Sequence, residues 1–383
     1  MTQSGPTSFN PLAVAQQSLD TPLSRILADR IQREGPMTFA EWMDQCLYHP
    51  EHGYYRSGRT TIGRDGDFLT SPEVHPLFGA AIAHLATELW RRGDGGEFHV
   101  AEIGPGTGAL AESFLRQIHT TSTELAKSLR YTLVERDQQT GSQQLERLRS
   151  FHGIHSINKL VGEQQLILAN ELLDALPVHR LQFTDDRWRE LQVDFSAAAG
   201  FHDALCDVSN LELLAPLSQL APADEQIVEI GLGRADAVSV LADAVAEGGL
   251  LLLFDYGYAR DRLYASWRRD GTLMTFRNHV SGDDPYLHPG EQDITAHIDI
   301  DQVTQSAVDA GLTPLPALSQ AEWLHNLGAA VLPAVADADT DTTAYLAARR
   351  AAETLTDPAG LGRIAVMGFT RGPTGPLPGW TTQ

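Results

Sequence analysis

The sequence predicts an α/β protein built around a mainly parallel sheet. Apolar segments of strand length alternate with amphipathic segments of helical period, a pattern typical of parallel strands joined by crossover helices. A glycine-rich turn, Gly104-Pro-Gly-Thr-Gly108, connects the first such strand to the helix after it. Another strand ends on the polar pair Asn170 and Glu171. Because ligands of such sheets bind beyond the carboxyl ends of the strands, these residues mark the expected site.

The N-terminal part precedes this pattern and differs from it. Residues 1–20 have the features of neither a secretion signal nor a transit peptide, and we expect a loose tail. Apolar spacing from Thr21 to Met43 predicts two short helices broken around Gly35-Pro36, with Thr38 as an N-cap. The segment from His49 to Pro76 is rich in Gly and Pro and predicts a long loop that binds something or covers a site.

The α/β elements follow in order along the chain. The first group is a helix Leu77–Trp90, a strand Phe98–Ile103, a helix Ala109–Ile118, a strand Tyr131–Val134, a helix near Asp137–Leu148 and a strand Leu166–Ala169. A hairpin around Thr184-Asp185-Asp186 interrupts them. The second group is a strand Gln226–Ile230, a helix near Ala235–Ala246, a strand Leu250–Asp255, a long excursion to about Gly362 and a closing strand Arg363–Thr370.

The composition excludes several classes of partner. With 50 acidic and 28 basic residues, the chain carries a formal charge of −22, so nucleic acid is an unfavourable partner. No apolar run approaches the roughly 18 residues that a membrane span needs. The two cysteines, Cys46 and Cys206, match no metal spacing and are expected to be thiols in a reducing compartment. We therefore expect a cytoplasmic protein without a membrane span.

The glycine turn indicates a nucleotide-like ligand. Gly104, Gly106 and Gly108 follow a strand and precede a helix, where backbone N–H groups face a ligand. Gly104, Gly106 and Ala109 also fit G-x-G-x-x-A, so a nicotinamide site stays open. However, Glu135 follows Gly104 by 31 residues rather than about 20. An acidic residue before the loop, Glu102, suits the cationic S-adenosylmethionine better than a phosphate.

Acidic residues at two strand ends are candidates for the reactive end of the site. Asn170, Glu171 and Asp174 follow one strand, and Asp255 ends another. Asp174 can alternatively be a charge that favours a helix N-terminus. For Asp255, a buried acid that caps the strand is an equally good interpretation.

Five sequence runs together resemble the MidA-like S-adenosylmethionine-dependent methyltransferases, whose mitochondrial members assist assembly of respiratory complex I. The runs are TSPEVHPLFG, AEIGPGTGAL, ANELLDALP, FDYG and HPGEQDITAHIDI, and the resemblance extends from about Met37 to Gly372. It implies a class I, Rossmann-like methyltransferase sheet with a helical N-terminal region and large insertions after the third and fifth core strands. The implied reaction is symmetric dimethylation of arginine in a protein partner. The sequence leaves the oligomeric state open, and a homodimer is one alternative.

The sequence pattern and the resemblance together predict a domain layout. The layout assigns 1–20 to a disordered tail, 21–96 to N-terminal helices and a cofactor-covering loop, 97–177, 225–255 and 363–371 to the methyltransferase core, 178–224 and 256–362 to insertions that form a substrate-side subdomain, and 372–383 to a tail.

Residue roles follow from the same resemblance. Gly104, Gly106 and Gly108 would bind the methionine part of S-adenosylmethionine, Glu135 its ribose, and Asn170 and Glu171 would lie beside the donor methyl. The loop Gly63–Pro72, which includes Thr70 and Pro72, would close over the cofactor. With Glu102, these residues form the expected cofactor site.

Methylation of arginine would need carboxylates, because a guanidinium stays protonated and must be oriented through its nitrogens. Glu171 is the first candidate, Asp174 the second, and Asp255 could share the task. Two alternatives stay open: a nicotinamide oxidoreductase, and an assembly factor that binds the cofactor without turnover.

The excursion after Asp255 contains a group of histidines and aspartates. His279, His288 and His297 lie there with Asp293 and Asp299, but without the close histidine spacing of a metal site. We expect a polar wall of the site and no metal.

Overall fold

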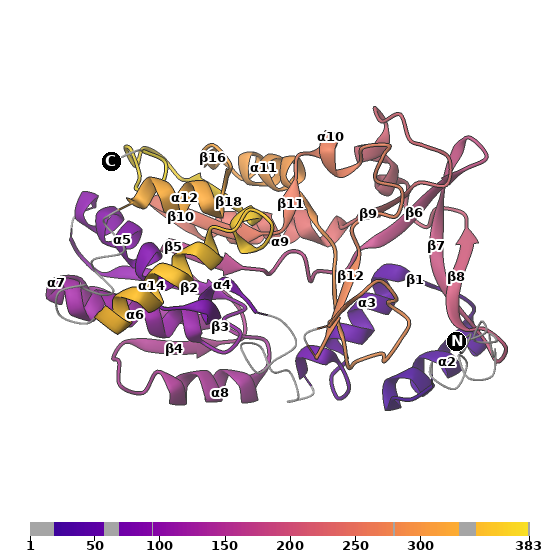
Figure 1. Ribbon diagram of the computed structural model, residues 1–383, viewed down its shortest axis with the longest axis horizontal. Helices are drawn as coiled ribbons and strands as arrows, with labels where there is room; N and C mark the ends of the chain where they lie inside the picture. Colours follow the sequence, from indigo (N-terminus) through magenta and orange to yellow (C-terminus); the bar gives the residue numbers. More distant parts are fainter. Residues whose placement is uncertain (1–18, 57–68, 94, 279, 329–341, 382–383) are drawn as a thin grey trace, which may run out of the picture. The chain divides into compact units, whose positions relative to one another are not determined.

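The computed structural model describes residues 19–56, 69–93, 95–278, 280–328 and 342–381 (Figure 1). The chain forms two compact units, which are described separately. Unit 1 comprises Met1–Thr60, Ala175–Leu232 and Tyr264–Ala296, and unit 2 comprises Thr61–Asp174, Gly233–Leu263 and His297–Gln383.

Unit 2 contains the predicted α/β sheet. Its main strands lie in the order β18-β10-β5-β2-β3-β4, with the short strands β16 and β17 on the outer side of β18. Strands β4, β3, β2, β5 and β10 are parallel to their neighbours, whereas β18 runs antiparallel to β10. The bounds are β2 Phe98–Ile103, β3 Leu129–Val134, β4 Ile154–Ile157, β5 Gln164–Asn170, β10 Val245–Asp255, β16 Thr313–Pro314, β17 Leu318–Ser319 and β18 Ala365–Thr370.

The strands predicted for this sheet are confirmed to within about five residues, and of its six main strands β4 was missed. Strand β4 is short and has no fully buried residue, so it lacks the apolar run by which the other strands were found. Since β4 precedes β5, the first large insertion follows the fourth strand of this sheet and not the third.

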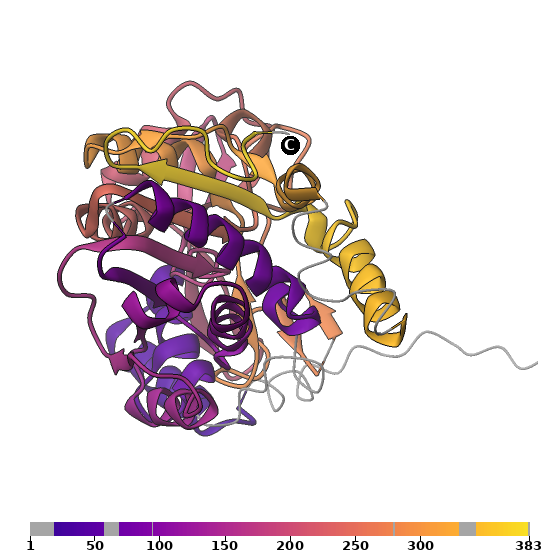
Figure 2. The ribbon, with the colours of Figure 1, turned by 90° about the vertical axis from the view of Figure 1, so that its left-hand side faces the viewer.

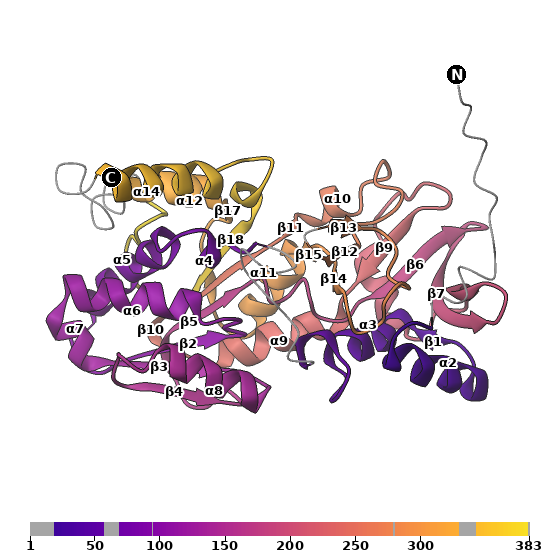
Figure 3. The same cartoon turned by 60° about the horizontal axis from the view of Figure 1, so that its bottom comes forward.

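Helices cover the sheet and connect its parallel strands. They are α4 Ser71–Val74, α5 Leu77–Arg92, α6 Ala109–Thr121, α7 Thr123–Ser128, α8 Gln138–Arg147, α9 Leu232–Asp243, α10 Arg260–Leu263, α11 Ile300–Asp309, α12 Gln320–Leu327 and α14 Thr342–Leu355, with a 3-10 turn η4 Leu361–Arg363 and the strand pair β11 Gly257–Tyr258 and β15 Ile298–Asp299. Helices α5 and α6 pack side by side, and α8 lies along β4 (Figure 3).

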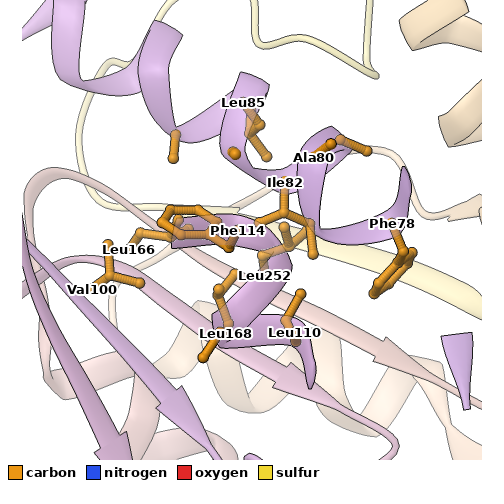
Figure 4. Close-up of a cluster of buried hydrophobic side chains, with 14 of the residues drawn as sticks. Phe78, Ala80, Ile82, Leu85, Val100, Leu110, Phe114, Leu166, Leu168 and Leu252 are labelled. Atoms are coloured by element: carbon orange, nitrogen blue, oxygen red, sulfur yellow. The ribbon is translucent and has the colours of Figure 1, made fainter. Parts of the chain in front are cut away.

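The core of unit 2 lies between α5, α6 and one face of the sheet. Phe78 and Phe114 project from the helices onto Val100, Leu168 and Leu252 of three adjacent strands (Figure 4). The intervening strand residues, including Ile167 and Leu253, are also almost fully buried. A sheet buried on both faces explains why its strands read as continuous apolar runs.

The C-terminal segment packs against this unit. Helix α14 contacts α4 and α5 (Figure 2). Residues 372–381, which we expected to be a tail, include a fully buried Leu377. The Trp380 indole donates to Pro316 O over 2.8 Å, and Asn326 donates to Gly379 O over 2.8 Å. Our expectation of a tail was therefore wrong for these residues, because apolar and hydrogen-bonding groups between the prolines hold the segment down.

Unit 1 is built on an antiparallel sheet. Strands β1, β7, β6 and β9 follow one another across it, and β8 pairs with β7. A second sheet has the order β13-β12-β14. The bounds are α2 Pro22–Glu34, β1 Met37–Thr38, α3 Phe39–Tyr48, η1 Tyr54–Arg56, β6 His179–Thr184, β7 Arg187–Ser196, β8 Gly200–Cys206, η2 Leu211–Leu217, β9 Ile227–Ile230, β12 Met274–Arg277, β13 Val280–Gly282 and β14 Asp293–Thr295.

Two local predictions for unit 1 are confirmed. Thr38 caps α3 through a reciprocal pair of hydrogen bonds with Glu41. The hairpin of β6 and β7 turns at Asp185 and Asp186, both with positive φ. In both cases the signal is local, because the side chain or turn residue bonds to its own neighbours in sequence.

The units divide the chain differently from the expected layout. Strand β9 was predicted in the core sheet but pairs with β6 of unit 1. The first N-terminal residues of the described chain also belong to unit 1, whereas residues from His297 onward belong to unit 2. A four-residue strand such as β9 carries no information about its partner, so the sequence pattern could not assign it. None of the helices in the described ranges is long and apolar enough to span a membrane.

Candidate active site

The strand register brings most of the predicted site residues to one edge of the unit 2 sheet. Ile103 at the end of β2 pairs with Val134 of β3 and with Ala169 of β5. Asn170 in turn pairs with Phe254 of β10. The residues that follow these positions therefore emerge at the carboxyl ends of four adjacent parallel strands.

The glycine loop has a backbone that favours glycine. Gly104, Gly106 and Gly108 have φ values of 63°, 54° and 80°. A Cβ on Gly104 would come within 3.0 Å of the Leu172 side chain. Gly108 adopts the left-handed conformation as the N-cap of α6. The three glycines thus keep bare backbone next to a helix N-terminus, which is an arrangement that suits a ligand rather than only a turn.

Helix α8 connects the glycine loop to Glu135. The Gln144 amide donates to Gly106 O over 2.8 Å and to Glu135 Oε2 over 3.3 Å. The other carboxylate oxygen of Glu135 accepts from Asp137 N over 3.0 Å. About one turn further along α8, Arg147 donates to Thr107 O and Oγ1, each over 3.1 Å. Glu135 is therefore held at a fixed place beside the loop.

Glu102 does not present a charge to the site at neutral pH. It is 3% exposed, and its carboxyl group accepts from the Tyr131 hydroxyl over 2.7 Å. Burial raises the pKa of Glu102 to about 8. The group is thus mostly protonated at pH 7, and the electrostatic attraction that the sequence suggested for Glu102 is largely absent there. Glu102 is protonated because it lies on a buried face of β2, and a sequence motif cannot specify such burial.

This burial makes the stability of the protein depend on pH. The folded pKa of Glu102 lies above its unfolded value near 4.5, so its contribution is fully present below about pH 4.5 and declines as the pH rises to 8. The decline is on the order of 4 kcal/mol. Glu102→Gln should remove this decline. The stability of the variant relative to wild type should therefore increase as the pH rises from 5 to 8. Urea unfolding at both pH values measures this, and an equal pH dependence in the two proteins would contradict it.

Asn170 and Glu171 form the end of β5. Asn170 Nδ2 donates to Glu171 Oε1 over 3.0 Å, while Asn170 Oδ1 is buried and has no hydrogen-bond partner among the described atoms. Glu171 has φ 51°, an uncommon conformation for a residue other than glycine, and its N–H donates to Phe254 O over 2.8 Å. Such backbone strain persists where the surrounding structure enforces it and is frequent in active sites.

Asp255 holds the segment after Glu171 in place. Its Oδ2 accepts from Leu172 N over 3.2 Å and Leu173 N over 2.7 Å, and Oδ1 accepts from Tyr256 N over 2.9 Å. Burial first, and then the charge of Asp174, raise its pKa well above the usual range. With both oxygens bonded to backbone, Asp255 fits the interpretation as a structural acid at the strand end and not a catalytic role.

Asp174 is also buried, and residues 171–176 are turns rather than a helix. The alternative interpretation of Asp174 as a helix N-terminal charge is therefore wrong. Arg234, which is itself buried, donates to the backbone of this segment through Leu173 O over 2.9 Å and Asp174 O over 3.3 Å. It also donates to His297 O over 3.0 Å. Arg234 thus fixes two segments of the site at once.

Thr70 and Pro72 lie at the start of α4, and residues 57–68, which contain most of the predicted covering loop, lie outside the described residues. The next residue of that helix, Glu73, accepts a hydrogen bond from Thr107 of the glycine loop. The segment is therefore attached to the loop by a side chain that the sequence argument did not select.

The histidines and aspartates of the excursion are distributed over both units. His288 and Asp293 belong to unit 1, and His297 and Asp299 to unit 2, while His279 lies outside the described residues. Asp299 caps α11 and pairs with Arg260 over 2.7 Å. Across the described ranges, no group of three or more His, Cys, Asp or Glu could hold a metal ion.

Gln144, Arg147, Glu73 and Arg234 were missed from the sequence. They support the site through backbone and side-chain contacts with residues distant in sequence, and helical residues with such roles carry no local motif. The sequence indicated this site through the glycine-rich turn Gly104–Gly108 that follows the strand.

Comparisons with known proteins agree with the geometry. The family of S-adenosyl-L-methionine-dependent methyltransferases matches residues 81–317. The human mitochondrial protein arginine methyltransferase NDUFAF7 is 30% identical over 347 residues, which cover 80% of this chain and 74% of the relative. The homologue from Drosophila melanogaster is 28% identical over 319 residues, 76% of this chain and 70% of the relative.

A solved structure extends the likeness to the whole chain. A protein from Burkholderia thailandensis, bound to S-adenosyl-homocysteine, has 28% sequence identity and a TM-score of 0.86, and the match covers 99% of this chain and 98% of that one. The native structure of a superfamily member from the same organism has a TM-score of 0.83, with coverage of 100% and 98%.

The residues present fit S-adenosylmethionine as the cofactor. The glycine loop leaves backbone uncovered, Glu135 offers a carboxylate for ribose hydroxyls, and the buried Asn170 Oδ1 is an acceptor without a partner in the described structure. The family match decides for methyl transfer over the nicotinamide interpretation of the same glycines. The chain belongs to the MidA-like family of S-adenosylmethionine-dependent methyltransferases.

Proposed function

We propose that this methyltransferase modifies arginine in a protein substrate and that the product is symmetric dimethylarginine. The observation that carries the proposal is the carboxylate of Glu171, whose backbone is strained and which lies at the end of β5 next to the strand end that leads into the glycine loop, with Asp174 three residues after it. Carboxylates bind a guanidinium group in preference to a neutral methyl acceptor, because they carry the opposite charge and pair with its planar N–H donors. The names of the relatives, which are protein arginine methyltransferases, support the same substrate class.

The chemistry requires orientation and one proton transfer. The cofactor supplies a methyl group on a positively charged sulfur. The attacking guanidinium nitrogen forms a bond to the methyl carbon as the sulfur–carbon bond breaks, and one N–H proton must then leave. Glu171 would orient the guanidinium through hydrogen bonds and accept that proton, while Asn170 fixes Glu171 Oε1. Asp255 and Arg234 would keep the Glu171–Asp174 segment in place and need not touch the substrate.

Transfer of label tests this proposal. The purified protein is incubated with methyl-labelled S-adenosylmethionine and a lysate of its own organism, and labelled proteins are hydrolysed to amino acids. Label should elute with symmetric dimethylarginine and disappear with Glu171→Gln. Label on lysine, on nucleic acid or on small molecules alone would reject arginine as the acceptor, whereas asymmetric dimethylarginine would reject the symmetry.

Gln144 provides a test of the cofactor site that is independent of the acceptor. Gln144→Ala removes the hydrogen bonds to Gly106 O and Glu135, so S-adenosyl-homocysteine should bind about 10-fold more weakly, as expected for roughly 1.4 kcal/mol. Isothermal calorimetry measures the dissociation constant. Gln143→Ala, on the exposed side of the same helix, is the matched control and should bind like wild type. Equal affinity of Gln144→Ala and wild type would show that the link has no role in binding.

A further inference from the structure

An aromatic residue directly follows the site at the end of β10. Tyr256 is the next residue after Asp255, and β10 is hydrogen-bonded there to Glu171, whose N–H donates to Phe254 O over 2.8 Å. The Tyr256 ring lies parallel to the ring of His297, with centroids 6.2 Å apart and planes 13° apart. This ring is therefore held in a fixed orientation at the end of the strand that is hydrogen-bonded to the backbone of Glu171.

A guanidinium already lies on this ring. Arg363, at the end of η4, places its Cζ 5.4 Å from the centroid of Tyr256. Arg363 is exposed, and no ion pair of its side chain occurs among the described residues. The Tyr256 ring is partly buried, but the Arg363 guanidinium on it is exposed to water, so this contact is weak and can be exchanged for another at small cost.

The ring also lies within the field of the two candidate carboxylates. Burial raises the pKa of the Tyr256 phenol, and Glu171 and Asp174 raise it further, whereas Arg363 acts in the opposite direction. Backbone hydrogen bonds bring the three residues to the same strand ends, because Glu171 N–H donates to Phe254 O and Asp255, which precedes Tyr256, accepts from Leu172 N and Leu173 N. A planar cation placed on Tyr256 would meet carboxylates at its edge and an aromatic ring on its face, which are the two kinds of contact that guanidinium forms best.

We propose that Tyr256 is the stacking surface for the acceptor guanidinium and that Arg363 occupies this surface until the acceptor replaces it. The inference rests on the proposed function, since it assigns the position at which an arginine acceptor is held. Tyr256 is a substrate-positioning residue in this scheme, and Arg363 is an internal competitor that weakens binding of acceptors with no other contacts to the protein.

A second arginine provides a matched control. Arg262, also exposed, places its Cζ 4.6 Å from the ring centroid of Tyr258, which contacts His297 edge to face at 5.4 Å. Removing Arg262 deletes the same type of cation–ring contact within unit 2 but leaves the Tyr256 surface occupied.

Binding of ethylguanidine tests the proposal without knowledge of the natural substrate. Ethylguanidine is titrated by NMR into wild type, Arg363→Ala and Arg262→Ala, each saturated with S-adenosyl-homocysteine, and ethylammonium serves as the control cation. Arg363→Ala should bind ethylguanidine about 2–5-fold more tightly than wild type. Arg262→Ala should bind like wild type, and ethylammonium should gain less than ethylguanidine from the Arg363 substitution.

Substitutions at the ring itself complete the experiment. In the Arg363→Ala background, Tyr256→Phe should keep the ethylguanidine affinity because it keeps the ring, and Tyr256→Leu should lose the gain. The affinity for S-adenosyl-homocysteine, which verifies that each variant is folded, should stay within about 2-fold. No gain in Arg363→Ala, an equal gain in Arg262→Ala, or a gain that survives Tyr256→Leu would each overturn the proposal. Failure of the proposed function would appear elsewhere, as label on an acceptor other than arginine.

Discussion

Glu171→Gly is expected to slow methyl transfer strongly and yet to give a more stable protein than Glu171→Ala. Both substitutions remove the carboxylate and its hydrogen bond with Asn170. They differ in the backbone, because φ is 51° at this position and a side chain with a Cβ is strained there. Relief of that strain by glycine should give a difference of about 1 kcal/mol in the free energy of unfolding.

The loss of activity has its own magnitude and control. Without Glu171, the rate of methyl transfer should fall on the order of 10²–10³-fold, as when one preorganised group that stabilises a transition state is removed. Glu171→Gln preserves size and should show a similar loss, while S-adenosyl-homocysteine affinity changes little in calorimetry. Urea unfolding gives the stabilities. If Glu171→Gly is no more stable than Glu171→Ala, the backbone at Glu171 is not strained. If Glu171→Gln keeps full activity, Glu171 is not the catalytic carboxylate.

Asp255→Ala should be the most destabilising of these substitutions. The substitution leaves the buried N–H groups of Leu172, Leu173 and Tyr256 without their acceptor. Each such group costs about 1–3 kcal/mol, and relief of the repulsion between Asp255 and Asp174 offsets part of the total. We expect a net loss of about 2–4 kcal/mol in the free energy of unfolding, measured with urea.

Asp255→Asn separates shape from hydrogen bonding. Its single side-chain oxygen can still accept from Leu173 N, but its amide group cannot accept from Tyr256 N, so its stability should lie between those of Asp255→Ala and wild type. The turnover number should fall in both variants, because the Glu171–Asp174 segment loses its support. If Asp255→Ala is as stable as wild type but inactive, Asp255 has a catalytic role and not a structural one.

The cofactor site shows what a sequence can indicate. Gly104, Gly106 and Gly108 could be recognised because the local backbone has positive φ, and glycine is the residue that adopts positive φ without strain. Glu171 has the same kind of backbone without a glycine, so the strain there was not visible in the sequence. Glu102 was predicted to bind the cofactor and Asp255 to share the catalytic task, but the partner of each carboxyl group lies in another strand or segment. Their roles could not be derived from spacing.

The sequence by itself determined the α/β class, the order of the main strands and helices and the position of the glycine loop, because these depend on hydrophobic period and backbone preferences within a few residues. Tertiary structure alone decided which sheet β9 joins, that Glu102 is buried and largely protonated, and that Gln144 connects Gly106 with Glu135. Burial and pairing depend on segments that are distant in sequence and meet only in the folded chain. For this protein, the pattern therefore predicted where the candidate site lies, and packing determined the burial and the hydrogen-bond partners of each acid there.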